Sequence, residues 1–121
     1  MTTSILFFNI MKQEEKQLLL KDLSARLSYG VKFQGEDSNV YTLDAANYFA
    51  LQVEDVVFKP YLRPMSSMTV DEIVTYSIYH DNPQNIGYGL IDWLNAHHFD
   101  YRGLILMGLA LEAPEGMYKT E

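Results

Sequence analysis

Cysteine is absent from the 121 residues of this sequence. Disulfide cross-links and thiolate-bound zinc are therefore excluded. A chain of this length buries about two thirds of its unfolded surface on folding, so it can form a hydrophobic core without cross-links. The composition, 48% hydrophobic and 21% charged, is that of a folded protein and not of a disordered one. We expect a single domain over residues 1–121, whose last residues, 116–121, form a loose tail.

Long apolar runs are absent as well. A membrane-spanning helix needs about 18 or more apolar residues in succession, and no segment approaches that length. The N-terminus has only a short apolar run at residues 5–8, without the positively charged start and small-residue cleavage site of a secretory signal. We therefore expect a cytoplasmic protein with no membrane partner.

Positive charge is scarce beyond residue 35, and the net charge of the chain is −7. Residues 1–35 carry five basic and three acidic side chains, whereas residues 36–121 carry four basic and thirteen acidic ones. Because nucleic-acid binding depends on Lys and Arg that neutralise phosphates, this distribution predicts no nucleic-acid partner. An acidic surface favours solubility and a basic protein partner.

Leucines recur at helical spacing near the start of the chain: Leu19, Leu20, Leu23 and Leu27. A helix over residues 10–28 would bring them to one face that packs on the core. Asn9 suits the N-cap of this helix, and Gly30 can adopt the left-handed conformation that commonly ends one.

Further helices are predicted in the C-terminal half. The capping box at residues 69–72 begins a helix over residues 70–80. Apolar residues form a stripe along this helix: Val70, Ile73, Val74 and Ile78. A third helix is expected over residues 84–97, and a short fourth one between Asp100, as its cap, and Gly108.

The region between the first two helices is rich in β-favouring residues separated by turns. Strands are predicted in four places: residues 31–34, 40–43, 48–53 and 56–58. The composition of residues 44–53 would also suit a helical turn. Two prolines make residues 59–65 an extended connector that leads out of the sheet. The predicted fold is α+β: an N-terminal helix, a small antiparallel β-meander, and two to three C-terminal helices packed on the sheet.

Three reactive side chains are concentrated at His97, His98 and Asp100. Beyond the end of the third helix, His98 and Asp100 could converge as a carboxylate–imidazole pair for acid–base chemistry. Adjacent histidines point about 100° apart on a helix and do not chelate one ion, so no metal site is predicted. The alternative is that these residues cap helix ends, as polar residues at such junctions usually do.

Four other side chains are candidates for contact with a partner: Tyr61, Arg63, Trp93 and Arg102. Arg63 lies in the proline-framed segment, where its guanidinium could meet a carboxylate or a phosphate. Tyr and Trp are over-represented among the residues that dominate binding at protein interfaces. The alternative for each arginine is an ion pair within the chain.

Two long motifs, KPYLRPMSSMT at residues 59–69 and DWLNAHHFDYRGLI at residues 92–105, resemble a family of small uncharacterised proteins from gut anaerobic bacteria and their phages. The resemblance covers most of residues 11–118. Relatives begin near Met11, which implies that residues 1–10 are an extension or an alternative start. The family has no established activity, so the resemblance implies a phage-linked or mobile-element accessory role and supplies no catalytic residues.

Two functions are therefore considered. The first is a non-enzymatic protein-interaction or accessory module that uses Tyr61, Arg63, and the junction at residues 93–102. The second is a small hydrolase or metal-dependent enzyme that uses His97, His98 and Asp100. The first is preferred because the sequence shows no catalytic motif, and no cofactor is expected.

Overall fold

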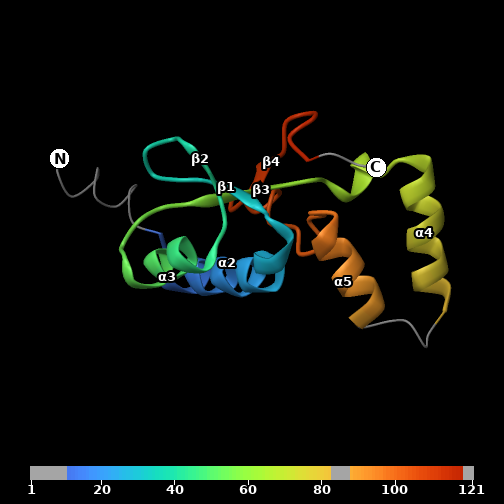
Figure 1. The fold of residues 1–121 in the computed structure, drawn as a ribbon, viewed down its shortest axis with the longest axis horizontal. Coiled ribbons are helices and arrows are strands. Elements are labelled where there is room, and N and C mark those ends of the chain that lie inside the picture. Colours follow the sequence, from blue (N-terminus) through green and yellow to red (C-terminus); the bar gives the residue numbers. More distant parts are fainter. Residues whose placement is uncertain (1–10, 83–87, 119–121) are drawn as a thin grey trace.

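The computed structural model describes residues 11–82 and 88–118, while residues 1–10, 83–87 and 119–121 fall outside the description. The fold is α+β, as predicted, with a mixed sheet in the order β2-β1-β3-β4 (Figure 1). Its strands are β1 (Lys32–Gln34), β2 (Val40–Thr42), β3 (Lys59–Leu62) and β4 (Leu111–Glu112). β1 runs antiparallel to both β2 and β3, whereas β4 runs parallel to β3.

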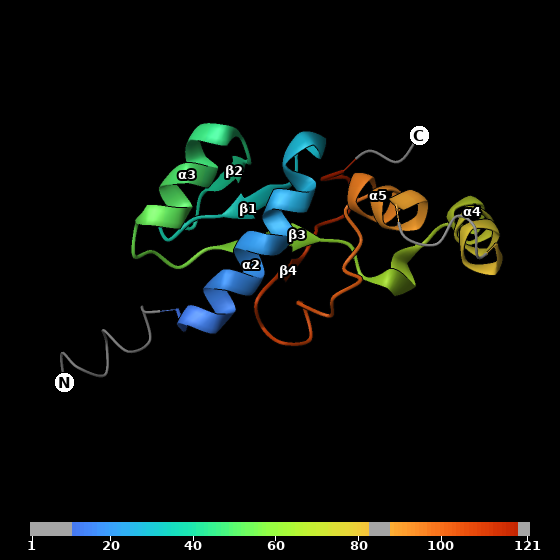
Figure 2. The same ribbon diagram turned by 90° about the horizontal axis from the view of Figure 1, so that it is seen from below.

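The first described helix, α2 (Gln13–Arg26), confirms the predicted N-terminal helix. Its expected N-cap, Asn9, lies outside the described residues, and Lys12 is the N-cap without a side-chain hydrogen bond. A 3-10 turn at Leu27–Tyr29 follows, and Gly30 ends it with a φ of 68°. Figures 1 and 2 show that α2 lies across one face of the sheet.

Residues 45–53 form a helix, α3 (Ala45–Val53), so of the two alternatives for residues 44–53 the helical one is confirmed and the strand at residues 48–53 is wrong. The reason is a capping box in which the Asp44 carboxylate accepts from the Asn47 amide at 2.8 Å, while the Asn47 side chain accepts from the Asp44 amide. This exchange satisfies backbone donors that begin a helix. Leu51 is then buried on the inner face of α3.

Strand β3 occupies the segment that was predicted to leave the sheet. It lies between β1 and β4, with Phe33 opposite Pro60. Pro60 is tolerated in an inner strand because β4 begins opposite Tyr61, so no β4 residue needs the N–H that proline lacks. The strand expected at residues 56–58 does not form, although Phe58 is buried in the core.

The parallel strand β4 makes the sheet mixed, which corrects the prediction of a purely antiparallel meander. Antiparallel neighbours can be joined by a short turn, whereas parallel neighbours need a connection of about a dozen or more residues. Residues 63–110 supply that connection between β3 and β4, and the sequence gives no local signal for where it returns.

The C-terminal helices are α4 (Val70–Asp81) and α5 (Tyr88–Ala96). The predicted capping box of α4 is present, with Thr69 and Glu72 each accepting from the other's amide. The predicted fourth helix is reduced to a single turn. Gly103 and Gly108 flank this turn with φ values of 75° and 78°, left-handed conformations that a helix cannot contain.

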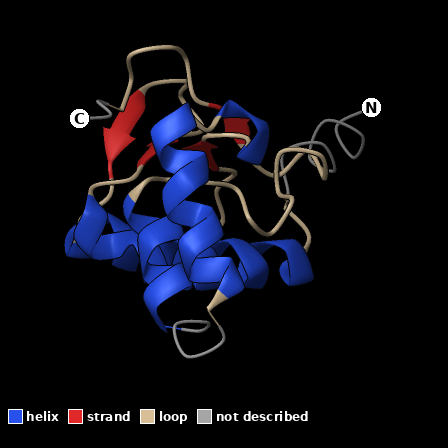
Figure 3. Cartoon of the chain, turned by 90° about the vertical axis from the view of Figure 1, so that its right-hand side faces the viewer, coloured by secondary structure: helices blue, strands red, loops and turns tan. Residues whose placement is uncertain are grey.

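The core lies between α2 and the sheet and is built mainly of leucine and phenylalanine: Leu19, Leu23, Val31, Phe33, Leu43, Leu51, Phe58, Leu62, Leu104 and Leu109. Seen from the α4 end, most of the helical residues lie below the strands (Figure 3). Helix α4 stands at the end of the molecule, where it packs on α5 and not on the sheet (Figures 1 and 2).

Candidate functional site

The two segments singled out by sequence meet in the structure. The Arg63 amide donates to the His98 carbonyl at 2.8 Å, and the Asp100 amide donates to the Arg63 carbonyl at 2.8 Å. Arg63 and Phe99 thereby form a parallel bridge beyond the end of β3. The candidate binding residues of the first segment and the candidate catalytic residues of the second belong to one junction.

His98 ends helix α5 in place of the usual glycine. Its φ of 64° is left-handed, its amide donates to the Asn95 carbonyl, and the Phe99 amide donates to the Leu94 carbonyl. These two bonds form a Schellman motif, in which the residue after the left-handed one packs back on the helix. Histidine is among the non-glycine residues that adopt this conformation more readily than others. The motif directs the Phe99 side chain into the interior, where it is 0% exposed.

The surroundings of His98 do not suit a catalytic base at neutral pH. The ring is 9% exposed and stacks on Tyr118 with centroids 3.7 Å apart. Burial is the main reason why the pKa of His98 is lowered to about 4, and the positive charges of Arg26 and Arg63 act in the same direction. His98 is therefore neutral at pH 7, and no hydrogen-bond partner for its Nδ1 lies within the described structure.

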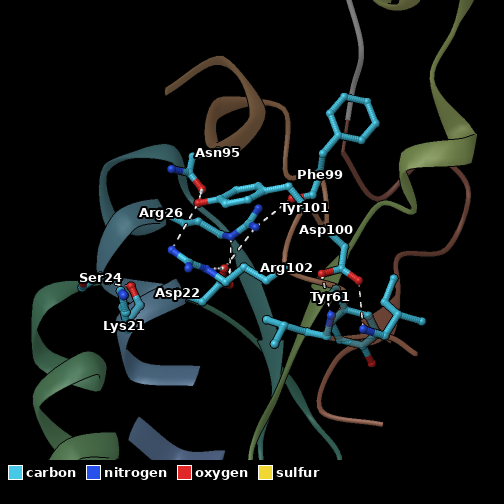
Figure 4. Close-up of polar contacts among 12 residues, drawn as sticks. Lys21, Asp22, Ser24, Arg26, Tyr61, Asn95, Phe99, Asp100, Tyr101 and Arg102 are labelled. Carbon is cyan, nitrogen blue, oxygen red and sulfur yellow. Dashed lines mark hydrogen bonds and ion pairs between the residues drawn. The ribbon is translucent and has the colours of Figure 1, made fainter. Parts of the chain in front are cut away.

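Asp100 caps the turn that follows it. Its carboxylate accepts from the Leu104 amide at 2.8 Å and from the Ile105 amide at 2.9 Å (Figure 4). No hydrogen bond joins it to His98 in the described part of the chain, so the structure does not bring the predicted acid–base pair together. The arrangement matches the alternative in which these residues satisfy backbone groups.

Arg63 forms an ion pair inside the molecule. Its guanidinium donates to both carboxylate oxygens of Glu72, at 2.7 and 2.8 Å, and lies 4.2 Å from the centroid of the Phe99 ring. The Arg63 hydrogen bonds hold the pKa of Glu72 below its usual value. His97 completes this cluster, with its Nδ1 3.6 Å from the Glu72 carboxylate. The guanidinium of Arg63 is thus engaged and unavailable for a ligand.

Trp93 is the aromatic centre of the same junction. Its ring lies 4.7 Å from that of His97, 5.7 Å from that of Phe99 and 6.4 Å from that of Tyr79 on α4. Tyr61 is half-buried, and its carbonyl accepts from the Tyr118 hydroxyl. Trp93 therefore joins α4 to α5, and these aromatic residues do not form one exposed patch.

The last candidate, Arg102, belongs to a second cluster that reaches helix α2. Asp22 accepts from Arg102 Nε and from Arg26 Nε, both at 2.9 Å (Figure 4). Arg26 also donates to the Phe99 carbonyl at 2.7 Å and lies 5.3 Å from the Tyr101 ring. Asp22 and Arg26 are 0% exposed. The cluster ties the beginning of the chain to the junction.

Sequence reasoning missed Asp22, Arg26 and Glu72 as parts of these clusters. A usable signal existed for two of them. Asp22 and Arg26 occupy the same helical stripe as Leu19 and Leu23, and a charged residue on the core-facing stripe of a helix needs a buried partner. Glu72 was assigned only to the capping box, which gives no sign that Arg63 shares its carboxylate.

The outer face of α4 carries a row of exposed apolar side chains. Its residues are β-branched and strongly exposed: Val70 77%, Ile73 50%, Val74 54% and Ile78 61%. Because successive helical residues are about 100° apart, these four project from the side opposite Glu72 and Tyr79, which face the body. We call these four residues the α4 face. It is a helix whose apolar side is turned to solvent.

Metal binding has no geometric support at this junction, since the described residues contain no group of three or more His, Cys, Asp or Glu side chains placed to hold an ion. Nor does any described helix have the length and apolar character needed to cross a bilayer. Comparison with protein-family models, with curated proteins and with solved structures finds no match for this chain.

Proposed function

We propose that this chain is a non-enzymatic protein-interaction module whose docking surface is the α4 face. The observation that carries this proposal is the exposure of four adjacent β-branched side chains on a helix that is held in place from its other side. Monomeric proteins rarely expose large contiguous apolar patches, and the largest patch on such a protein is often an interaction site. A helix face of this kind is suited to an amphipathic helix of a partner protein.

The charge around the α4 face supports a basic partner. Residues 64–101 contain no lysine or arginine, whereas they contain five aspartate and glutamate residues. Of these, Asp71, Asp81 and Asp92 are exposed on α4 and α5. A partner helix with an apolar stripe and lysine or arginine on its flanks would bury the α4 face and neutralise the Asp71 and Asp81 carboxylates on the same helix.

The inner side of α4 is anchored in a way that favours binding. The ion pair of Glu72 with Arg63 fixes the first turn of the helix, and the contact of Tyr79 with Trp93 fixes a later one. A surface that is already ordered loses little conformational entropy when the partner docks. The contacts at the junction thus hold α4 in the position in which its outer face can bind a partner.

The enzymatic alternative receives less support. It needs His98 and Asp100 as a reactive pair. His98 is buried and neutral at pH 7, and the Asp100 carboxylate accepts hydrogen bonds from backbone amides. The phage-linked or mobile-element role stays a prediction that rests on the sequence resemblance alone.

The test uses two designed fluorescein-labelled peptides, each about five helical turns long. They share a leucine stripe and carry either lysine or glutamate on both flanks. Fluorescence anisotropy with the purified chain should show that the lysine peptide binds about tenfold more tightly or better, because its charge complements the acidic border. Added salt should weaken this binding.

The matched variants distinguish the α4 face from other exposed apolar residues. The double variant Ile73→Ser/Ile78→Ser should abolish binding, whereas Phe49→Ser/Val53→Ser on α3, at 63% and 64% exposure, should not change it. Equal loss in both variants would contradict the proposal, as would equal affinity for the two peptides. A dimer in light scattering that Ile73→Ser/Ile78→Ser dissociates would show that a second copy of the chain occupies this face.

A further inference from the structure

A second surface feature, far from α4 in the sequence, is a cavity between the β1–β2 hairpin and helix α3. Its volume is about 440 Å³, which is within the range of small-molecule sites. The wall is mostly apolar and is formed by Phe33, Tyr41, Ala50, Leu51, Val56 and Val57. The cavity opens to solvent, so a ligand could enter without a change in the fold.

The aromatic wall of this cavity is held in position by its neighbours. Phe33 and Tyr41 stack with ring centroids 5.5 Å apart. The Tyr41 hydroxyl donates to Asp37, which lowers the pKa of that carboxyl. A Cβ at Gly35 would lie 2.9 Å from the Tyr41 ring, so glycine is what lets the ring lie against the hairpin turn. These contacts fix the wall before any ligand arrives.

The charged residues that line the cavity are all acidic: Glu36, Asp37 and Glu54. The Asp37 carboxylate is already engaged, since it accepts from Tyr41 and from the amide and side chain of Asn39. The exposed carboxylates of Glu36 and Glu54, by contrast, have no hydrogen-bond or ion-pair partner within the described ranges, although the Lys16 ammonium donates to the backbone carbonyl of Glu54 at 2.7 Å. No lysine or arginine lines the cavity.

We propose that this cavity binds a primary ammonium group carried on an unbranched aliphatic stem. The stem would lie on the apolar wall at Leu51 and Val56, where its burial is favourable. The ammonium would lie at the mouth of the cavity, beside the exposed Glu36 and Glu54 carboxylates and the exposed ring of Tyr41, whose face attracts cations. Such a group is found both in the lysine side chain of another protein and in free aliphatic amines.

The experiment is an NMR titration of the full chain with three probes: n-butylammonium, n-butanol, and a lysine blocked at both ends as an amide. Saturable shifts at the Gly35 and Ala50 amides are expected with n-butylammonium. The uncharged n-butanol should bind at least about fivefold more weakly, since an exposed ion pair contributes up to about 1 kcal/mol. If the blocked lysine also binds, the site accepts the lysine side chain of another protein. If the blocked lysine does not bind, the site is specific for free aliphatic amines.

Variants separate this site from a general attraction of cations to an acidic protein. Glu54→Gln should weaken binding of n-butylammonium, and Ala50→Phe should abolish it by filling the cavity. Glu14→Gln, an exposed acid on α2, should have no effect. The proposal is overturned if n-butanol binds as well as the amine, if the shifts do not saturate, or if Glu14→Gln and Glu54→Gln act equally. Circular dichroism of each variant confirms that it remains folded.

Discussion

Helices α2 and α4 are similar in length, 14 and 12 residues, but they distribute their side chains in opposite ways. α2 buries the charged pair Asp22 and Arg26 together with two leucines. α4 buries Glu72 and leaves its β-branched residues in solvent. Both helices therefore turn ionised groups inward, but only α2 turns its apolar stripe inward as well.

This difference shows that the hydrogen-bond and ion-pair partners available to a helix decide which of its faces is buried. Arg102 and the Phe99 carbonyl meet α2 and satisfy its charged pair, while the leucines beside that pair pack on the sheet. Arg63 forms an ion pair with Glu72 that holds this side of α4 against the body of the protein, so the apolar stripe lies on the opposite side. An exposed apolar stripe is then a consequence of where the ion pair lies, and it is available for a partner.

Removal of Asp22 should have the largest effect on stability. Asp22→Ala leaves two arginines without their shared carboxylate, one of them fully buried, and should lower the free energy of unfolding by about 3–5 kcal/mol. Urea unfolding followed by circular dichroism measures this loss. Glu14→Gln, on the exposed side of α2, should stay within about 0.5 kcal/mol of wild type. A loss for Asp22→Ala below about 1 kcal/mol would remove the distinction between the two faces of α2.

Neutralisation of Glu72 should have the next largest effect and should act on α4. Glu72→Gln leaves Arg63, 11% exposed, without its counter-charge and should cost about 2–3 kcal/mol. Hydrogen exchange should show faster exchange in α4 than in α2. Asp71→Asn is the neighbouring control, expected to cost at most about 1 kcal/mol through the helix dipole. Equal protection of α4 in the variant and in wild type would contradict the role of this ion pair.

The same ion pair has a defined pH dependence. Because the pKa of folded Glu72 lies below its ordinary value of 4.5, the stabilisation is complete above pH 4.5 and is lost as the pH falls through the lowered pKa. The stability difference between wild type and Glu72→Gln should therefore shrink below pH 4.5. A difference that is constant down to pH 3 would mean that the charge of Glu72 is not what stabilises α4.

Protonation of His98 should destabilise the fold in a higher pH range. The unfolded chain takes up this proton near pH 6.5 and the folded chain only near pH 4, so stability should fall between these values by about 2 kcal/mol. His98→Asn should remove this slope, because asparagine tolerates the left-handed conformation and does not titrate. His80→Asn, an exposed histidine on α4, should keep it. An unchanged slope in His98→Asn would show that His98 does not cause it.

Substitution on the α4 face should have the smallest effect on stability. Ile78→Ser should change the free energy of unfolding by less than about 0.5 kcal/mol, since the side chain is 61% exposed. Leu23→Ala on α2 is the contrasting substitution and should cost about 2–5 kcal/mol. Thermal or urea unfolding compares the two. A cost near that of Leu23→Ala for Ile78→Ser would mean that other residues of the chain cover this face.

Local signals in the sequence predicted the parts of the fold that depend on neighbouring residues. The capping box at Thr69 and the left-handed Gly30 were sufficient to place the start of α4 and the end of the 3-10 turn that follows α2. The reciprocal bonds of Asp44 and Asn47 are equally local, but the β-favouring residues at 48–53 suggested a strand as well as a helical turn. Intrinsic β preference was outweighed there by the cap.

Contacts between residues far apart in the sequence, such as strand pairing, could not be predicted from these local signals. Residues 59–65 contain two prolines, and only the position of β4 explains how Pro60 fits an inner strand. At the candidate site, the sequence indicated the junction and proposed capping as one role of His98 and Asp100. It offered an ion pair within the chain as the alternative for each arginine but did not reveal the partners. Arg102 and Asp22 are 80 residues apart, and Glu72, nine residues from Arg63, was accounted for by the capping box.

Tyr118 has a consequence for how the protein is made. Its hydroxyl accepts from the Lys32 amide and donates to the Tyr61 carbonyl, so it bridges β1 and β3 beyond their last paired residues. The Lys32–Tyr118 contact spans 86 residues, and the Asp22–Arg102 contact spans 80. During synthesis on the ribosome, α2 emerges with Asp22 and Arg26 lacking their distant partners, and these contacts form only after residues 102 and 118 have left the exit tunnel. Folding of this domain is therefore expected to follow the emergence of residue 118, at a rate limited by these long-range contacts.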